Sequence, residues 1–339
     1  MKKQKNICFV AGKSGGHLIP ALTIAQKLTL EDNNTKILLI TTNSPLDKKI
    51  IKESNIKMVH TQLPLGKLCK NAILRYPILT FHLSLSFAKS LYFLIKHRPK
   101  KIISTGGLVS LPVCIAAFLL KIPIELFELN AMPGKAVKFL APFATTIYTC
   151  FTKAINCLPK HKCKISQYPI RFSHSSHFNK KINEKKTKFT ILVLGGSQGS
   201  LAINKLIKEL VIKTPNIKQN IQIIHQTGTL DKTDWQTFYA KHNIDALAFD
   251  FTQNISDYYP LADIVVCRAG AGTLFETIFF KKRCITIPLE AKTTNHQVDN
   301  AKEIQKMYPN LVTMIRQNKQ YTDLFIAEIS KLITTQKHN

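Results

Sequence analysis

The chain has 339 residues, a length more typical of two domains than of one. Apolar residues make up 45% of it and charged residues 20%, ordinary values for a globular protein. The net charge of +28 is uneven: residues 1–183 hold 28 Lys and Arg against 6 Asp and Glu, and residues 184–339 hold 20 against 14. A lysine-rich proteome would raise both halves alike, so the basic first half indicates an anionic partner, namely phospholipid headgroups, a pyrophosphate or nucleic acid.

The sequence disfavours a secretory signal and a membrane-spanning helix. The apolar run at residues 7–11 is too short for a signal and leads into a glycine-rich turn. The longest apolar stretch, residues 108–120, contains Pro112 and falls short of the roughly 20 residues that cross a bilayer, which favours a buried core segment.

The eight cysteines show no CxxC spacing, and most lie among apolar neighbours. Buried free thiols in a reducing cytoplasm are therefore expected, rather than disulfides or a zinc site. They are Cys8, Cys69, Cys114, Cys150, Cys157, Cys163, Cys267 and Cys284.

Strands and helices alternate in the first half, which predicts a parallel sheet with helices on both faces. The predicted elements are strands at 6–11, 36–41, 102–104, 122–128 and 145–149, with a helix from about Pro20 to Leu30.

The same pattern starts again after a polar, lysine-rich linker at residues 174–188. Its predicted elements are strands at 189–194, 221–226, 246–250, 264–267 and 285–288, with a helix at 202–213. Two strand–glycine turn–helix openings predict two Rossmann-like α/β domains facing a central cleft, the GT-B fold of many nucleotide-sugar transferases. The predicted domains are 1–173 and 189–325, followed by a C-terminal helix at 326–339 for which packing back on the first domain is one option.

The first glycine-rich turn, GKSGGH at residues 12–17, lies between a strand and a helix. Glycines let a ligand approach the backbone, and the N–H groups of a helix start favour negative charge. The turn is neither GxGxxG nor a P-loop. His17 makes it more specific, because a histidine at this place could act as a general base near neutral pH.

The second turn, GGSQGS at residues 195–200, again joins a strand to a helix. Ser197 and the helix dipole could hold a diphosphate. A tight structural turn is the alternative for both runs.

The third run, RAGAGTLFE at residues 268–276, follows the strand at 264–267. Its small residues allow close backbone approach, and the Glu276 carboxylate could hold two ribose hydroxyls. The alternative is a helix N-terminal charge that favours the helix dipole.

The fourth run is HQVDNA at residues 296–301. Gln297 and Asn300 would share one face of a helix, and amide side chains both donate to and accept from hexose hydroxyls. Alone, the pattern is equally typical of a solvated helix face.

Taken together and in this order, the four runs resemble the MurG family, the lipid II-forming N-acetylglucosaminyl transferases. The resemblance covers nearly the whole chain and includes TGG at 105–107, Glu128 with Asn130, PG at 133–134 and PIR at 169–171. It implies that the donor binds mainly to the second domain, while the first domain takes the lipid acceptor and faces the membrane.

The resemblance also implies which residues contact UDP-GlcNAc, and the fourth run adds Asn300 to them. These residues are Ser14, Gly15, Gly16, Asn130, Arg171, Ser197, Thr252, Ala271, Gly272, Thr273, Leu274, Phe275, Glu276, Gln297 and Asn300.

The reaction implied is inverting transfer of GlcNAc from UDP-GlcNAc to the muramyl C4 hydroxyl of a polyprenyl-pyrophosphate-linked acceptor, which converts lipid I to lipid II in peptidoglycan synthesis. His17 would take the proton, and Glu128 is the second candidate base. No metal or other cofactor is expected, because the sequence lacks a DxD triplet and backbone N–H groups could meet the leaving-group charge.

Two other functions are weighed against this one. A GT-B transferase acting on another membrane lipid is disfavoured by the run at 296–301. A non-catalytic nucleic-acid-binding protein would suit the charge, but no RRM, zinc-finger or KH signature is present, so no nucleic-acid partner is expected.

Several positions depart from the family pattern, mostly on the acceptor side. They are Lys13, Leu108, Phe127, Leu129, Val137 and the run KKR at 281–283.

Residues 65–94 combine basic with large apolar side chains. Helices covering the first sheet would give the same pattern. The alternative is that the early part of this segment, roughly residues 65–79, dips into an anionic membrane surface, at the cytoplasmic face of the bacterial inner membrane.

Overall fold

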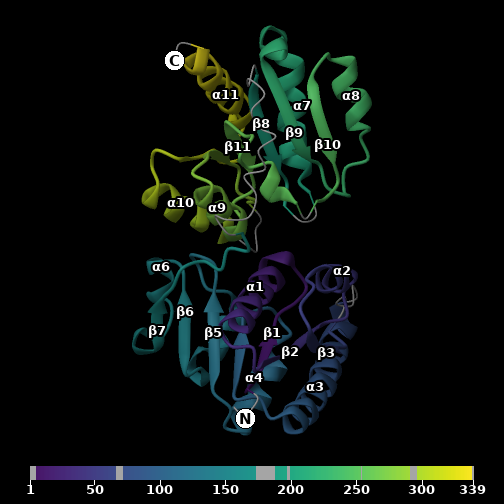
Figure 1. Ribbon diagram of the computed structural model, residues 1–339, viewed down its shortest axis with the longest axis vertical. Helices are drawn as coiled ribbons and strands as arrows, with labels where there is room; N and C mark the ends of the chain where they lie inside the picture. The colour runs from purple at the N-terminus through teal and green to yellow at the C-terminus, as the bar shows by residue number, and fades with distance from the viewer. Residues whose placement is uncertain are drawn as a thin grey trace. The chain divides into compact units, whose positions relative to one another are not determined.

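In the computed structural model the described residues are 5–65, 72–172, 188–196, 199–252, 254–290 and 296–337. They form two compact units, Met1–Arg171 and Phe172–Asn339, and each is described by itself (Figure 1). The predicted linker at 174–188 lies almost entirely outside the described residues.

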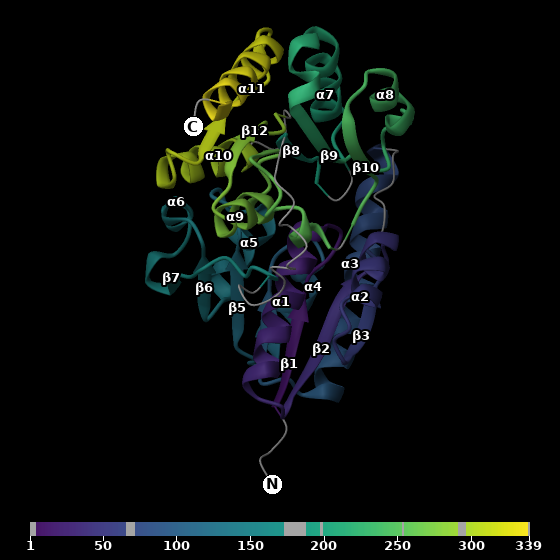
Figure 2. The ribbon, with the colours of Figure 1, turned by 45° about the horizontal axis from the view of Figure 1, so that its top comes forward.

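The first unit is built on a seven-stranded parallel sheet in the order β3-β2-β1-β4-β5-β6-β7. Strands β1, β2 and β3 can be followed side by side in Figure 2. The inner strands are short apolar runs, as expected where helices cover both faces of a sheet. The strands are β1 (Lys5–Val10), β2 (Thr35–Thr42), β3 (Met58–Leu63), β4 (Lys101–Ser104), β5 (Ile124–Glu128), β6 (Thr146–Thr149) and β7 (Cys163–Ile165).

The sheet of the first unit separates two apolar cores. One core lies under α1 and α2 and includes Phe9 and Leu39, and the other lies under α3 and α4 and includes Val10 and Leu94. The helices are α1 (Gly15–Glu31), α2 (Pro45–Glu53), α3 (Ala72–His97), α4 (Ser110–Leu119), α5 (Lys135–Leu140) and α6 (Thr152–Ile155), with short 3₁₀ turns η1 (Ala141–Phe143) and η2 (Lys160–Lys162).

Helix α1 begins at Gly15, five residues before the predicted start at Pro20. Proline is favoured at the first position of a helix, which is why the prediction began there. In the structure Pro20 lies inside the first turns and is buried. The earlier start places the GKSGGH turn directly on the first turn of the helix.

The second unit has a six-stranded parallel sheet in the order β10-β9-β8-β11-β12-β13. Strands β8, β9 and β11 have the bounds that the sequence predicted. The strands are β8 (Phe189–Leu194), β9 (Ile221–Gln226), β10 (Asp245–Phe249), β11 (Ile264–Cys267), β12 (Arg283–Thr286) and β13 (Val312–Met314). The helices are α7 (Leu201–Lys213), α8 (Trp235–Lys241), α9 (Ala271–Phe279), α10 (His296–Met307) and α11 (Tyr321–Lys337), with 3₁₀ turns η4 (Pro215–Asn220) and η5 (Ile255–Asp257).

The C-terminal helix differs from its prediction. It begins at Tyr321 rather than at residue 326, and its buried side chains Phe325, Ile329 and Ile333 belong to the core of the second unit. These residues are four apart, so they form one apolar stripe on the helix. That stripe packs α11 into the core of the second unit.

The prediction of a buried core segment at 108–120 is confirmed by the structure. The stretch forms α4, whose Val113, Cys114 and Ala117 are buried in the core. The described cysteines are all free; only Cys157 is exposed, while Cys69 lies outside the described residues.

Helix α3 has an unusual distribution of side chains. It buries Ser86 and Ser90 completely, while Tyr76 and Phe81 are 74% and 67% exposed. In the described part of the chain, Tyr76–His97 is the one helical stretch long and apolar enough to cross a membrane. Other α3 residues, including Leu94, pack in the first unit's core, so α3 covers the sheet with one face and presents aromatic side chains on another.

Candidate functional site

In both units the sequence motifs follow three neighbouring strands. The turns after β1, β4 and β5 lie at one edge of the first sheet, and the turns after β8, β11 and β12 lie at one edge of the second. Strands in a parallel sheet point the same way, so each set of turns meets at the carboxyl ends, where α/β proteins bind ligands.

The first turn is held by a carboxylate that the sequence motifs did not include. Lys13 has φ of 69°, a left-handed conformation that favours glycine, and glycine is the residue that the family pattern has there. Its backbone N–H donates to both oxygens of Asp47, at 3.0 and 3.1 Å. Asp47 is fully buried near the start of α2, and the Thr42 hydroxyl also donates to it. This buried anchor offsets the strain of the left-handed lysine and sets the path of the turn.

The His17 ring is oriented by a backbone carbonyl. Its Nδ1 lies 2.7 Å from the Thr105 carbonyl oxygen. The Thr105 hydroxyl donates to the His17 carbonyl at 2.9 Å. A carbonyl oxygen only accepts, so Nδ1 carries the proton and the ring lone pair is on Nε2. This tautomer is the one in which Nε2 can take a proton from a hydroxyl.

The glycines after Thr105 form the wall beside this ring. Gly106 and Gly107 have φ of 100° and 91°. A Cβ on Gly106 would lie 3.3 Å from the His17 Cε1 atom. The TGG sequence is therefore required both by backbone conformation and by the space that the imidazole occupies.

Glu128, the second candidate base, holds a turn. Its carboxylate accepts from the backbone N–H groups of Asn130 at 2.8 Å and Gly134 at 2.9 Å. The Asn130 amide donates to it as well, at 3.2 Å. Burial raises the pKa of Glu128, and these hydrogen bonds oppose the rise. These hydrogen bonds show that Glu128 shapes the loop that carries Asn130, and its role as second candidate base stays a prediction.

The second glycine-rich turn contains glycines of two kinds; its Ser197 lies outside the described residues. A Cβ on Gly199 would come 2.5 Å from the Thr227 carbonyl oxygen, whereas one on Gly196 would meet none of the described residues within 4 Å. Both have positive φ, of 85° and 87°. Gly199 is thus required by packing, while Gly196 faces open space that a ligand could enter.

These two glycines give a matched pair of variants. Gly196→Ala should lower the free energy of unfolding by about 1–2 kcal/mol, the cost of a left-handed alanine. Gly199→Ala should lose more, because collision with backbone atoms adds about 1–3 kcal/mol. Urea unfolding measures both. Equal stability of the two variants would contradict the distinction.

A network of buried polar side chains lies next to this turn and hydrogen-bonds to its backbone. His225 lies between the Tyr239 hydroxyl, 2.8 Å from Nδ1, and the Asn204 Oδ1 atom, 3.1 Å from Nε2. The Asn204 amide donates to the Thr227 carbonyl at 3.0 Å, and Gln226 donates to the Gly196 carbonyl at 3.0 Å. Burial lowers the pKa of His225 to about 3, so the ring is neutral. The sequence motifs did not include these residues. The available signal was His225 and Gln226, two polar residues at the end of an apolar strand.

The third motif opens helix α9 after β11. Gly270 is the N-cap, and a Cβ there would meet no atom of the described part of the chain within 4 Å. The half-buried Glu276 accepts from the Tyr259 hydroxyl at 3.4 Å. Tyr259 is fully buried and stacks on Phe280 with ring centres 4.6 Å apart. Tyr259, which the motifs missed, therefore makes a long hydrogen bond to one oxygen of this carboxylate.

The remaining predicted contacts differ in exposure. Gly272, Thr273 and Phe275 are half-buried at the start of α9, whereas the side chain of Leu274 is fully buried and could meet a ligand only through its backbone. Thr252, also half-buried, follows β10 and accepts from the Asn254 N–H at 3.2 Å. Arg171 is half-buried at the end of the first unit.

The two amides of α10 have different environments. Gln297 is half-buried, and its Oε1 accepts from the Leu289 N–H at 2.8 Å. Asn300 is fully buried and donates to the Ala269 carbonyl at 3.2 Å. Asn300 thus ties α10 to the turn before α9, and the expectation that both amides meet sugar hydroxyls stays a prediction.

Family models and solved structures identify the class of protein to which the chain belongs. Residues 7–149 match the glycosyltransferase family 28 N-terminal domain, and residues 190–339 match the family 28 C-terminal domain. The solved structure of Acinetobacter baumannii MurG is similar with a TM-score of 0.72, at 22% identity over 97% of this chain and 91% of that one. A UDP complex of S. aureus MnaA gives 0.66, at 12% identity over 97% and 89%. These findings confirm the predicted class of two Rossmann-like domains in a glycosyltransferase.

Curated relatives narrow the class further. A protein of Francisella tularensis subsp. holarctica is 33% identical over 97% of this chain and 89% of its own length. One of Myxococcus xanthus is 29% identical over 88% and 77%. Both are named UDP-N-acetylglucosamine–N-acetylmuramyl-(pentapeptide) pyrophosphoryl-undecaprenol N-acetylglucosamine transferase. The chain belongs to this family, the MurG N-acetylglucosamine transferases.

Proposed function

We propose that the chain transfers GlcNAc from UDP-GlcNAc to the muramyl C4 hydroxyl of lipid I, giving lipid II. The acceptor oxygen attacks the anomeric carbon, the bond from that carbon to the diphosphate oxygen breaks, and UDP leaves. The hydroxyl proton passes to His17. The observation that carries this proposal is the His17 ring, whose Nδ1 is held 2.7 Å from the Thr105 carbonyl so that Nε2 has the lone pair.

Donor binding is proposed at the carboxyl edge of the second sheet. Glu276 would accept from the ribose hydroxyls, the open backbone at Gly196 and Gly270 would meet the diphosphate, and Gln297 would meet the sugar. Preorganised N–H groups stabilise developing negative charge without reorganisation. The contacts expected of Ser14 to Gly16 and Asn130, which lie on the first unit, stay predictions.

The proposed reaction is tested by UDP release. UDP should form from UDP-GlcNAc when a lipid I analogue is present and at a much lower rate without it. Replacing the analogue by a diacylglycerol acceptor tests the alternative of another lipid substrate. Equal UDP release with and without the lipid I analogue would contradict the proposed acceptor.

We also propose that α3 docks the enzyme on an anionic membrane surface, at the cytoplasmic face of the inner membrane. An acceptor with a polyprenyl tail stays in the bilayer, so the enzyme has to reach it there. Phe81 and Leu85 are 67% and 48% exposed on α3, and the first half of the chain is strongly basic. Each Lys or Arg near an anionic surface contributes about 1 kcal/mol, which gives reversible, salt-sensitive attachment.

Vesicle sedimentation tests this docking. Phe81→Ser with Leu85→Ser should reduce binding to anionic vesicles several-fold, because two exposed apolar side chains no longer enter the interface. The matched control is Ile212→Ser with Leu230→Ser, which are 53% and 57% exposed on the second unit. Binding should also weaken as salt rises. Binding that ignores both salt and lipid charge would contradict the proposal.

A further inference from the structure

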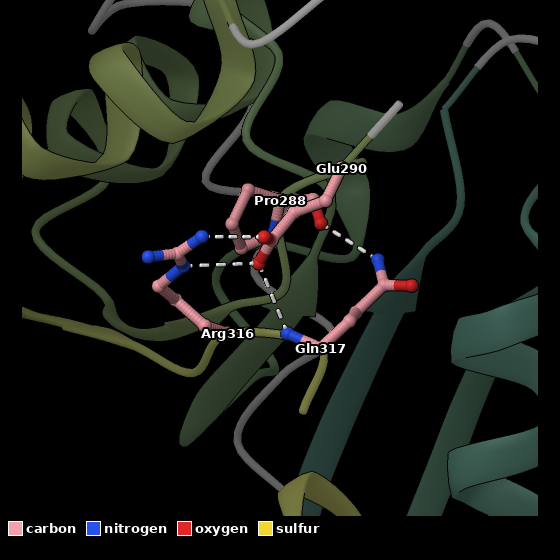
Figure 3. Close-up of polar contacts among 4 residues, drawn as sticks. All are labelled: Pro288, Glu290, Arg316 and Gln317. Atoms are coloured by element: carbon pink, nitrogen blue, oxygen red, sulfur yellow. Dashed lines mark hydrogen bonds and ion pairs between the residues drawn. The ribbon is translucent and has the colours of Figure 1, made fainter. Parts of the chain in front are cut away.

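The segment that follows β12 is hydrogen-bonded to the segment that follows β13. The Glu290 carboxylate accepts from Arg316 twice, from Nε at 3.1 Å and from Nη2 at 2.6 Å, and it accepts from the backbone N–H of Gln317 at 3.1 Å. The Gln317 amide donates to the Pro288 carbonyl at 2.7 Å. Figure 3 shows these four residues, Pro288, Glu290, Arg316 and Gln317, which we call the clamp.

The clamp is more than an ordinary surface ion pair. A two-pronged contact between guanidinium and carboxylate fixes direction as well as distance, unlike a single contact through a flexible lysine. The Glu290 side chain is only 24% exposed. Hydrogen bonding to Arg316 holds the pKa of Glu290 below its usual range, so the carboxylate is charged at neutral pH.

Leu289 lies between Pro288 and Glu290 of the clamp. Its backbone N–H donates to Gln297 Oε1, at 2.8 Å. A backbone N–H needs an acceptor, so the amide oxygen of Gln297 must face Leu289, and the NH₂ group is turned the other way. The Ile287 carbonyl is fixed as well, by the Arg268 guanidinium at 3.2 Å. These contacts hold the backbone of residues 287–290 in place. That backbone in turn determines that the NH₂ end of the Gln297 amide points away from Leu289.

We propose that the clamp is a positioning device for the donor sugar: it fixes the Leu289 N–H, which orients Gln297 so that its NH₂ donates to an oxygen of the sugar. Glu290 and Arg316 are positioning residues that do not touch the substrate. The inference rests on the proposed function, in which Gln297 contacts GlcNAc. It assigns the clamp to recognition of the sugar and not of the nucleotide, whose proposed contacts lie after β8 and in α9.

A merely structural role makes a different prediction. If the clamp only tied the β13–α11 connection to the sheet, its loss would lower stability or weaken UDP and UDP-GlcNAc equally. An orienting role affects the sugar alone. The ratio of the two affinities therefore separates the roles.

Calorimetry with UDP and with UDP-GlcNAc provides the test. Arg316→Met should weaken UDP-GlcNAc binding about threefold to tenfold, the range for one neutral hydrogen bond, and leave UDP binding within about twofold. Gln297→Ala should have the same effect, and the double variant should be no weaker than Gln297→Ala, because both changes remove one contact. Lys101→Met, which breaks the Lys101–Glu125 ion pair of the first unit, is the matched control and should change neither affinity.

The outcomes distinguish the clamp from the function on which it rests. Equal losses for UDP and UDP-GlcNAc, or a loss in Gln297→Ala with none in Arg316→Met, would overturn the clamp and leave the proposed function standing. No UDP-GlcNAc binding by the unaltered chain would overturn both. Should Arg316→Met fail to fold, Arg316→Lys keeps the charge without the two-pronged contact and allows the same comparison.

Discussion

Replacing His17 by alanine should lower kcat about 10²- to 10⁴-fold, the usual contribution of a positioned general base, while UDP-GlcNAc affinity stays within about twofold. The reason is the fixed tautomer. The Thr105 carbonyl accepts a hydrogen bond from the Nδ1–H group at 2.7 Å, so the ring presents Nε2 as the proton acceptor. Steady-state UDP release with a lipid I analogue measures kcat, and calorimetry measures donor affinity.

The control is a histidine of the same unit without these contacts. His161 is exposed in the 3₁₀ turn η2, and His161→Ala should leave kcat unchanged. A kcat for His17→Ala within about threefold of the unaltered enzyme, far below the range for a general base, would assign the proton to another group. Glu128 is then the next candidate, with Glu128→Gln as its test.

The central strands were predictable because a strand buried on both faces is a continuous apolar run in the sequence. Strands β8, β9 and β11 are apolar runs covered on both faces, and each was predicted with its observed bounds. The three that were missed, β3, β7 and β13, lie at the ends of the sheets. An end strand pairs on one side only and can be short and polar, like the run MVHTQL of β3, so local composition does not separate it from a loop.

The candidate site was predictable in its glycine turns and not in the groups that hold them. The turns are contiguous runs with a physical signature. Asp47 lies 34 positions from Lys13, and Thr105 lies 88 positions from His17. Contacts at such separations depend on the strand order, which no local pattern contains. Asn300 shows the opposite limit: its spacing placed it on the face of Gln297, but helix packing turned it onto the Ala269 carbonyl.

The last prediction concerns Glu276. If it accepts from both ribose hydroxyls, Glu276→Gln should weaken UDP binding tenfold or more, because hydrogen bonds to a charged group contribute roughly 1.5–3 kcal/mol each. The alternative is a favourable charge at a helix N-terminus. Glu276 is the sixth residue of α9, and the first turn of that helix holds no acid. The dipole effect fades within the first turn, so it cannot explain a large change.

The two explanations separate in one pair of measurements. A ribose contact predicts a large loss of UDP affinity by calorimetry with little change in Tm, whereas a dipole effect predicts a change in Tm alone. Glu209→Gln, on the exposed Lys213–Glu209 pair of α7, is the control for removing a carboxylate from the same unit. Tyr259→Phe should reproduce part of the loss, since the Tyr259 hydroxyl holds one Glu276 oxygen at 3.4 Å. Unchanged UDP affinity in Glu276→Gln would remove this residue from the site and leave Tyr259 with a packing role against Phe280.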